Sequence, residues 1–417
     1  MRILVVSDLY PPHYIGGYEL ACQNVVDCLR ERGHEFYVLT STYGVVGTSI
    51  ENQTYRWLCY HSSLPSPSNS FLRLVSTEIR DNSVLRWLIH QVKPELAYVW
   101  NVRGLSKSLL ITLQRLRVPT VYMIQDFWLE ESISSDHWLS LWSRQSAGRF
   151  KQRVKSLLVS LGVEAALGRL VPTDPRELRI DHVSFVSHFN KTKTTAAGVR
   201  VKHPVVIHNG IETAKFRKRE PDKHDGTLRL LYVGQLHAQK GVHTTVEAVR
   251  RLIVDGHQDI RLTIAGGAPL SETYEQYIHG LVATENLERY VQFLGHIPRE
   301  HIVKAYHDHD VLLFTSIVER GFPLVLLEAM ASGLAVVGTL SGGAADILVP
   351  GENCLTFSPG DASALAERIR ALMADPQLRQ RIARRGEELV RREFDLERIV
   401  DQVEAHLFSV LDGRLAV

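Results

Sequence analysis

Residues 314–333 have the sequence FTSIVERGFPLVLLEAMASG, and this stretch decides the fold class. Its start belongs to an apolar run that predicts a buried strand ending near Thr315. Pro323 suits the first turn of a helix because its ring fixes a helical φ, and the apolar pattern carries that helix to about Ser332. A buried strand, a loop and a helix in this order are typical of the βαβ units that build parallel sheets.

Glu328 stands inside this otherwise apolar helix. Burying a carboxylate is costly unless it is hydrogen-bonded, so the residue needs partners. Its two oxygens can accept two hydroxyl groups, as the diol of a ribose offers. The sequence therefore predicts that Glu328 binds a ribose, with a purely structural role as the alternative.

Short apolar runs alternate with helical patterns on both sides of this segment. We expect strands at 3–6, 36–40, 96–100, 121–124, 183–186, 205–208, 228–233, 260–265, 291–294, 311–314 and 335–338. We expect helices at 18–32, 242–254, 274–283, 300–307, 324–332 and 362–411, the last broken near Asp375 and Pro376. The fold class predicted is α/β.

The polar stretch 209–227 separates two groups of strands, and all six tryptophans lie before it. The chain has 417 residues, whereas single cores stop growing at roughly 250–300. The sequence therefore predicts two Rossmann-like domains with a cleft between them, at 1–208 and 209–393. A helical insertion is expected near 129–178 and a final helix at 394–417.

The composition excludes several classes of protein. The formal net charge is +2, which gives no global drive toward nucleic acid. Four cysteines without a C-x-x-C pair are no disulfide framework, so a cytoplasmic setting is expected. The N-terminal apolar run is too short for a signal-peptide core, and no uncharged apolar stretch is long enough to span a membrane.

A basic segment interrupts the pattern, since no acid occurs between Asp136 and Glu164. The basic residues in question are Arg144, Arg149, Lys151, Arg153 and Lys155, and the apolar residues at helical spacing are Phe150, Val154, Leu157, Leu158 and Leu161. The segment 144–161 predicts a basic amphipathic helix. Three interpretations stay open: a solvated face packed on the domain, a peripheral contact with the inner face of an anionic membrane, or a substrate lid.

Two glycine-containing loops are candidates for binding phosphate. Gly16 and Gly17 follow the first strand and precede a helix, where backbone amides and the helix N-terminus attract anions; a plain tight turn is the alternative. The absence of G-x-G-x-x-G argues against a nicotinamide dinucleotide. In the second half, Gly234 follows a strand and Lys240 stands just before a helix, so the lysine can reach an anion held there.

In their order, these motifs resemble those of the retaining GT-B glycosyltransferases of family 4, over almost the whole chain. The resemblance rests on Tyr10-Pro11-Pro12-His13, Gly16-Gly17, Arg32-Gly33-His34-Glu35, Asn101, Gly104-Leu105-Ser106, Asp126-Phe127-Trp128, Ile207-His208-Asn209-Gly210-Ile211, Gly234, Lys240-Gly241, Gly321 to Met330, Ser341-Gly342-Gly343 and Pro359-Gly360-Asp361. It implies a GT-B architecture, with two Rossmann-like domains facing each other. The second domain would hold a nucleotide sugar, and the final helix would cross back to the first.

The resemblance also implies roles for individual residues. Lys240 would neutralise the diphosphate of the donor, and Glu328 would bind its ribose. The loop at Gly16 and Gly17 would close over phosphates or donor sugar. Backbone at Phe322, Pro323 and Leu324, with Gly234 and Gln235, completes the expected donor-binding set.

Three positions depart from the family pattern. Gln235 stands where an arginine is common, so one cation for the diphosphate is missing. Arg320 replaces the first glutamate of an E-x7-E motif, so either Glu319 serves in its place or Arg320 offers a cation. Gln125 replaces a histidine that precedes the Asp-aromatic-Trp run, which makes Asp126 the better candidate at the donor sugar.

The expected function is that of a metal-independent, retaining glycosyltransferase that moves a sugar from a nucleotide sugar to a hydroxyl acceptor. Lys240, Asp126, Glu319 and Arg320 are its candidate catalytic residues. No cofactor and no metal ligand set is expected, and the run from His307 to Asp310 is interpreted as a helix end leading into a strand. The alternatives are a nucleotide-sugar epimerase or hydrolase, and a non-catalytic relative that binds nucleotide sugars.

Overall fold

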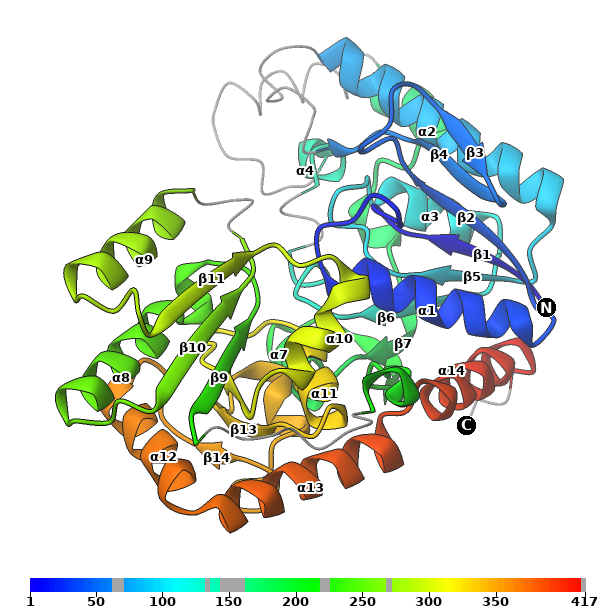
Figure 1. Cartoon of the computed structure of the whole chain (residues 1–417). Helices are drawn as coiled ribbons and strands as arrows, with labels where there is room; N and C mark the ends of the chain where they lie inside the picture. The colour runs from blue at the N-terminus through cyan, green and yellow to red at the C-terminus, as the bar shows by residue number, and fades with distance from the viewer. Residues whose placement is uncertain (62–70, 132–135, 143–161, 218–225, 268–271, 414–417) are drawn as a thin grey trace. The chain divides into compact units, whose positions relative to one another are not determined.

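The structure is a computed structural model, which describes residues 1–61, 71–131, 136–142, 162–217, 226–267 and 272–413. The chain divides into two compact α/β units (Figure 1). Unit 1 comprises Met1–Val186, Asn190–Ile207 and the residues from Val400 on. Unit 2 comprises Ser187–Phe189 and His208–Ile399, so the main division lies one residue before the boundary expected after 208.

Unit 1 is built on an eight-stranded sheet with the order β3-β4-β2-β1-β5-β6-β7-β8. Its strands are β1 (Arg2–Val6), β2 (Glu35–Ser41), β3 (Ser49–Glu51), β4 (Thr54–Leu58), β5 (Leu96–Val99), β6 (Thr120–Ile124), β7 (Ile180–Phe185) and β8 (Val201–Val206). β3 runs antiparallel to β4, and the other neighbouring strands pair in parallel. The central strands β5 and β6 are buried along their whole length, as expected for a parallel sheet covered on both faces.

The helices described for the first half of the chain are α1 (Gly17–Glu31), α2 (Phe71–Val92), α3 (Ser108–Arg115), α4 (Leu139–Trp142), α6 (Val163–Leu170) and α7 (His188–Ala196). The sequence patterns missed α2, whose buried face carries Glu78, Asp81 and Asn82 and therefore breaks the apolar period. They also missed α3 and the β3–β4 hairpin. Its two-residue turn, Asn52-Gln53, takes positive φ at both positions but lacks the usual glycine.

Unit 2 is built on a six-stranded parallel sheet with the order β11-β10-β9-β12-β13-β14. The strands are β9 (Leu228–Val233), β10 (Ile260–Ala265), β11 (Val291–Gly295), β12 (Val311–Phe314), β13 (Ala335–Gly338) and β14 (Leu355–Thr356). The helices are α8 (Val242–Val254), α9 (Glu272–Thr284), α10 (Arg299–His307), α11 (Leu324–Ala331), α12 (Ala362–Ala374), α13 (Pro376–Glu393) and α14 (Leu396–Leu411). β9, β10, β12, β13 and α8 have the bounds expected from the sequence, because each is a short, strongly patterned run with clear ends.

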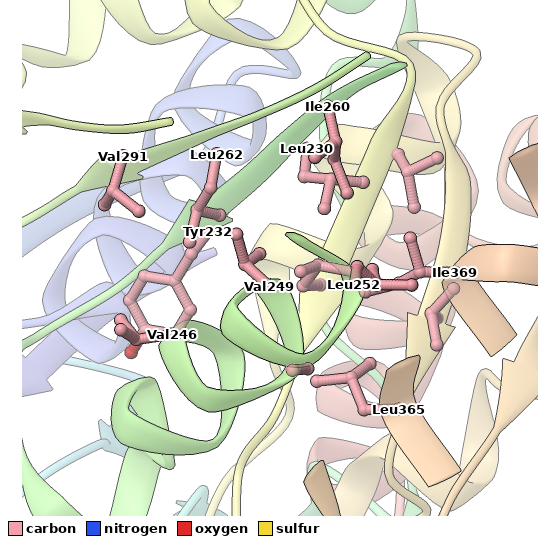
Figure 2. Close-up of a cluster of buried hydrophobic side chains, with 14 of the residues drawn as sticks. Leu230, Tyr232, Val246, Val249, Leu252, Ile260, Leu262, Val291, Leu365 and Ile369 are labelled. Carbon is pink, nitrogen blue, oxygen red and sulfur yellow. The ribbon is translucent and has the colours of Figure 1, made fainter. Parts of the chain in front are cut away.

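The core of unit 2 lies between this sheet and the helices α8 and α12. Figure 2 shows Val246, Val249 and Leu252 of α8 facing side chains of the sheet such as Leu230 and Leu262. Leu365 and Ile369 of α12 close the same cluster. This packing holds the carboxyl end of β9, from which the loop to Lys240 starts.

The C-terminal helix α14 begins in unit 2 and belongs to unit 1 from Val400 on. Within unit 1 its Glu404 accepts a hydrogen bond from Arg32, at 2.8 Å, and lies 2.6 Å from His34. Among the described helices, none combines the length and apolar character needed to cross a membrane. The basic helix expected at 144–161, with Arg144, Arg149, Lys151, Arg153 and Lys155, lies outside the described residues.

Candidate functional site

The candidate site of unit 2 lies at the carboxyl edge of its sheet, where the strand order reverses. In this sheet β9 is the first strand along the chain. β10 and β11 lie on one side of it, and β12, β13 and β14 lie on the other. Ligands of open α/β sheets bind outside the strands' carboxyl ends at such a switch point. Here the flanking loops follow β9 and β12, and they carry Lys240 and Glu319.

Two glycines allow the loops at this edge to approach one another through their backbones. Gly241 has a φ of +70°, and a Cβ on it would collide with the carbonyl oxygen of Thr315 after β12. Gly342 has a φ of +59°, and a Cβ there would collide with the carbonyl oxygen of Glu319. Side chains of other residues would push these loops apart, so glycine is required at both positions.

Lys240 and Glu319 form an ion pair across the switch point. Lys240 Nζ donates to Glu319 Oε2 at 2.6 Å. The other carboxylate oxygen accepts the backbone N–H groups of Arg320 and Gly321, at 3.1 and 3.3 Å. The side chain of Glu319 is 10% exposed and that of Lys240 32% exposed, so the pair is held in place yet reachable from solvent.

This geometry bears on the departure at Arg320. It is the Glu319 carboxylate that turns inward to meet Lys240, whereas the Arg320 residue is exposed. Ser341, in the loop after β13, accepts the backbone N–H of Glu319 through its hydroxyl oxygen at 2.8 Å. Three loops therefore fix Glu319. Of the two candidates, Glu319 and Arg320, the glutamate is the better placed to contact Lys240.

Glu328 lies on α11 and is buried, with partners that the sequence patterns missed. Tyr306 of α10 donates its hydroxyl to Oε2 at 2.8 Å, and the guanidinium of Arg299 lies 4.0 Å from Oε1, beyond hydrogen-bonding distance. Burial raises the pKa of Glu328, although Arg299 and the Tyr306 hydrogen bond oppose that shift. One oxygen is thus satisfied, and Oε1 keeps the capacity to accept further hydroxyl groups.

The remaining donor-side candidates also lie at this edge. Phe322 is buried against the rings of His208 and Phe394, with centroids 5.0 and 5.7 Å away. Pro323 is the N-cap of α11, so the first helical N–H groups begin at Leu324. After β9, the Gly234 N–H donates to Ala265, and the Tyr232 hydroxyl donates to the Gln235 carbonyl oxygen at 3.0 Å.

Gly16 and Gly17 lie at the start of α1 in unit 1. Gly16 is the N-cap, and its N–H donates to Glu19 Oε2 at 3.0 Å. A Cβ at Gly16 would meet no atom within 4 Å, and its φ of −150° is open to any residue. Neither packing nor backbone conformation therefore requires glycine there, and space beside the loop stays open.

Asp126 follows β6 in unit 1 and is held from two sides. Its Oδ2 lies 3.1 Å from the guanidinium of Arg103, and its Oδ1 accepts the N–H of Trp128 at 2.9 Å. Its side chain is partly exposed, whereas the neighbouring Gln125 is buried.

Asp8 is a residue that the sequence patterns missed. It follows β1 at the switch point of unit 1, where its two carboxylate oxygens accept the N–H groups of Leu9 and Gly104, at 2.9 and 3.0 Å. Burial raises its pKa to about 7, and the nearby charge of Glu19 adds to the rise. An acid two residues after the first strand was the available sequence signal.

The sequence matches known family descriptions over most of its length. The description "Glycosyltransferase Family 4" covers residues 15–215, and "Glycosyl transferases group 1" covers residues 214–389. The glycogen synthase of Mycobacterium tuberculosis is 31% identical over 417 residues, which is 96% of this chain and 92% of the synthase. A sulfoquinovosyl transferase of Arabidopsis thaliana is 25% identical over 93% of this chain and 69% of its own.

Solved structures share the fold. HepE of Anabaena, crystallised with UDP and with UDP-glucose, superposes with a TM-score of 0.69 at 20% identity, over 98% of this chain and 100% of that one. Sucrose-phosphate synthase of Thermosynechococcus elongatus gives 0.69 at 20% identity, over 99% of both chains. Both have the two-unit α/β architecture expected from the sequence, and with the sequence match they identify the chain as a GT-B glycosyltransferase that belongs to family 4.

Proposed function

We propose that this glycosyltransferase takes its sugar from a nucleotide-sugar donor, passes it to a hydroxyl acceptor with retention of configuration, and needs no catalytic metal ion. The observation that carries the proposal is the Lys240–Glu319 pair at the switch point of unit 2. The complexes of HepE with UDP and UDP-glucose support a nucleotide sugar as the donor class.

The electrostatic demand of this reaction explains the residues at that edge. When the bond from the sugar to the diphosphate breaks, negative charge grows on the leaving oxygens. A fixed ammonium and the N–H groups at the start of α11 stabilise that charge without reorganising. Glu319 holds Lys240 in place before the donor binds, and the diphosphate then takes over part of its ion pair.

Bond changes balance without a protein nucleophile. The acceptor oxygen forms the new bond to the sugar on the side from which the phosphate leaves. The acceptor's proton passes to a departing phosphate oxygen, so the products are the glycoside and a nucleoside diphosphate. Retention follows because both bonds lie on the same face of the sugar ring.

The remaining residues take supporting roles in this proposal. Glu328 Oε1 accepts the ribose hydroxyls, since Tyr306 occupies only Oε2. The backbone at Phe322, Pro323 and Leu324 lines the donor. In unit 1, the family resemblance assigns Gly16 and Gly17 to the phosphates or the donor sugar, and Asp126 to the donor sugar.

Turnover with a panel of UDP-, GDP- and ADP-hexoses tests the proposal, with and without EDTA. Glycogen is the first acceptor to try, because the Mycobacterium tuberculosis relative is named a glycogen synthase. We expect transfer with the donor's anomeric configuration, unaffected by EDTA. Breakdown of the donor without transfer would indicate a hydrolase, and conversion of the donor sugar into its epimer would indicate an epimerase. Binding of the donor without turnover would indicate a non-catalytic relative.

A further inference from the structure

Two histidines and an aspartate of unit 2 converge outside the residues assigned to the donor. His188 is the first residue of α7, His208 follows β8, and Asp346 ends the turn Gly342–Asp346 after β13. Asp346 Oδ2 lies 3.1 Å from His188 Nδ1 and 3.1 Å from His208 Nε2. The ligand atoms of the three residues all lie within 4.8 Å of one another.

The donor set selects a class of ion. Two imidazoles with one carboxylate suit zinc and neighbouring transition metals, whereas magnesium and calcium prefer oxygen ligands alone. With metal–ligand bonds of about 2.0–2.1 Å at tetrahedral angles, neighbouring ligand atoms lie about 3.3 Å apart. The two nitrogen–oxygen separations of 3.1 Å are close to that edge, and the two ring nitrogens, which lie within 4.8 Å of each other, move to the same spacing as the ion binds.

Two of the three ligands are already held in position. The Asp346 side chain is largely buried, and its Oδ2 also accepts the backbone N–H of His188 at 2.7 Å. The ring of His208 packs against Phe322 and Phe394, with centroids 5.0 and 5.5 Å away. The His188 side chain is 71% exposed, which leaves a side open for the ion to enter and for water to complete the shell.

We infer that His188, His208 and Asp346 bind a zinc ion, with water as the fourth ligand. The metal takes the place of the protons between each ring nitrogen and Asp346, and each neutral imidazole then carries its proton on its other nitrogen. The ion has no part in the transfer reaction. Because His208 packs on Phe322, its ligation restrains the residue that precedes Pro323 and α11.

Cobalt(II) is the probe, because a four-coordinate site gives it visible absorption bands. Protein stripped with a chelator is titrated with Co²⁺ and then with Zn²⁺. We expect one Co²⁺ per chain, displacement by Zn²⁺, and a higher Tm with Zn²⁺ but not with Mg²⁺. His188→Ala should weaken Zn²⁺ binding at least about tenfold, since a ligand matters at least as much as its supporting shell.

Two comparisons separate loss of the site from loss of the fold. Without metal, His188→Ala should melt close to the parent protein, because the side chain is exposed. His90→Ala, which removes an exposed histidine on α2 of unit 1, should bind Zn²⁺ like the parent. Equal Zn²⁺ affinity in His188→Ala and the parent, or no cobalt absorption in the parent, would overturn the inference whether or not the chain transfers sugar.

Discussion

Lys240 places a positive charge at the switch point of unit 2, where its ammonium lies 2.6 Å from Glu319. Lys240→Ala should lower kcat by about 10²- to 10³-fold, the usual cost of one electrostatic group at a developing charge, with a smaller change in KM. The matched control is Lys304→Ala, which removes an exposed lysine on α10. Steady-state kinetics with the active donor decide, and full turnover by Lys240→Ala would refute the phosphate role.

Gln235 and Arg320 test whether a second cation is missing or replaced. Gln235→Arg should leave kcat equal or higher, because it restores a charge beside the diphosphate. If Arg320 reaches the same charge as Lys240, the losses in Lys240→Ala/Arg320→Ala should differ from the sum of the single losses. Strictly additive losses in the double-mutant cycle would place Arg320 elsewhere.

Glu328 separates a binding role from a structural one. Glu328→Gln should weaken binding of the nucleoside diphosphate by about 10- to 100-fold, because a hydrogen bond to a charged group contributes about 1.5–3 kcal/mol. Tyr306→Phe removes the partner of Oε2 alone and should change Tm more than nucleotide affinity. Calorimetric titration and melting curves measure the two effects, and unchanged affinity in folded Glu328→Gln contradicts the ribose assignment.

Asp8 predicts a dependence of stability on pH. Its folded pKa of about 7 lies above the ordinary 3.8, so the stability it contributes is full below about pH 4 and is lost as the pH rises toward 7. Each pH unit in that window costs the fold about 1.4 kcal/mol from this group. The free energy of unfolding in urea should therefore fall less from pH 5 to pH 8 in Asp8→Asn than in the parent protein. A difference between the two proteins that does not change with pH would contradict the raised pKa of Asp8.

At the scale of elements, the buried face of α8 packs on the sheet beside α12 (Figure 2). Val249→Ala should lower the free energy of unfolding by about 2 kcal/mol, because two buried methyl groups leave a cavity. Val254→Ala changes the same residue type on the same helix at a site 73% exposed and should have little effect. Chemical denaturation measures both, and equal losses would contradict packing as their cause, because alanine has the higher helix propensity at either position.

At the scale of the whole molecule, the net charge of +2 is small, so any attraction to an anionic surface must come from a local basic segment. If the segment 144–161 contacts a membrane, the protein should sediment with anionic vesicles at low salt and be released at high salt, since salt screens exposed charges. Neutral vesicles and a chain with Arg149, Lys151, Arg153 and Lys155 changed to glutamine are the controls. Absence of binding to anionic vesicles at low salt removes the membrane interpretation and leaves the lid and the solvated face.

The sequence by itself determined the features that depend on neighbours in the chain. The bounds of β9, β10, β12, β13 and α8 follow from apolar runs and their end signals, and the family resemblance pointed to two α/β units. Lys240 and Glu328 stood out for the same reason, because a lysine before a helix and a glutamate inside an apolar one are local departures. The sequence patterns did not predict the helix α2 because its buried face is partly polar. The helical period of apolar residues is interrupted at those polar positions.

Only the tertiary structure decided which side chains meet. Glu319 meets Lys240 from 79 positions away, Tyr306 satisfies Glu328 from another helix, and Asp346 draws His188 and His208 together from two other segments. The order of the strands brings the loops of Lys240 and Glu319 to one edge of the sheet of unit 2, and Gly241 and Gly342 let the loop backbones there touch. Burial then selects partners for each charge, because an unpaired charge away from water is too costly, and burial belongs to the packed molecule rather than to any short stretch of its sequence.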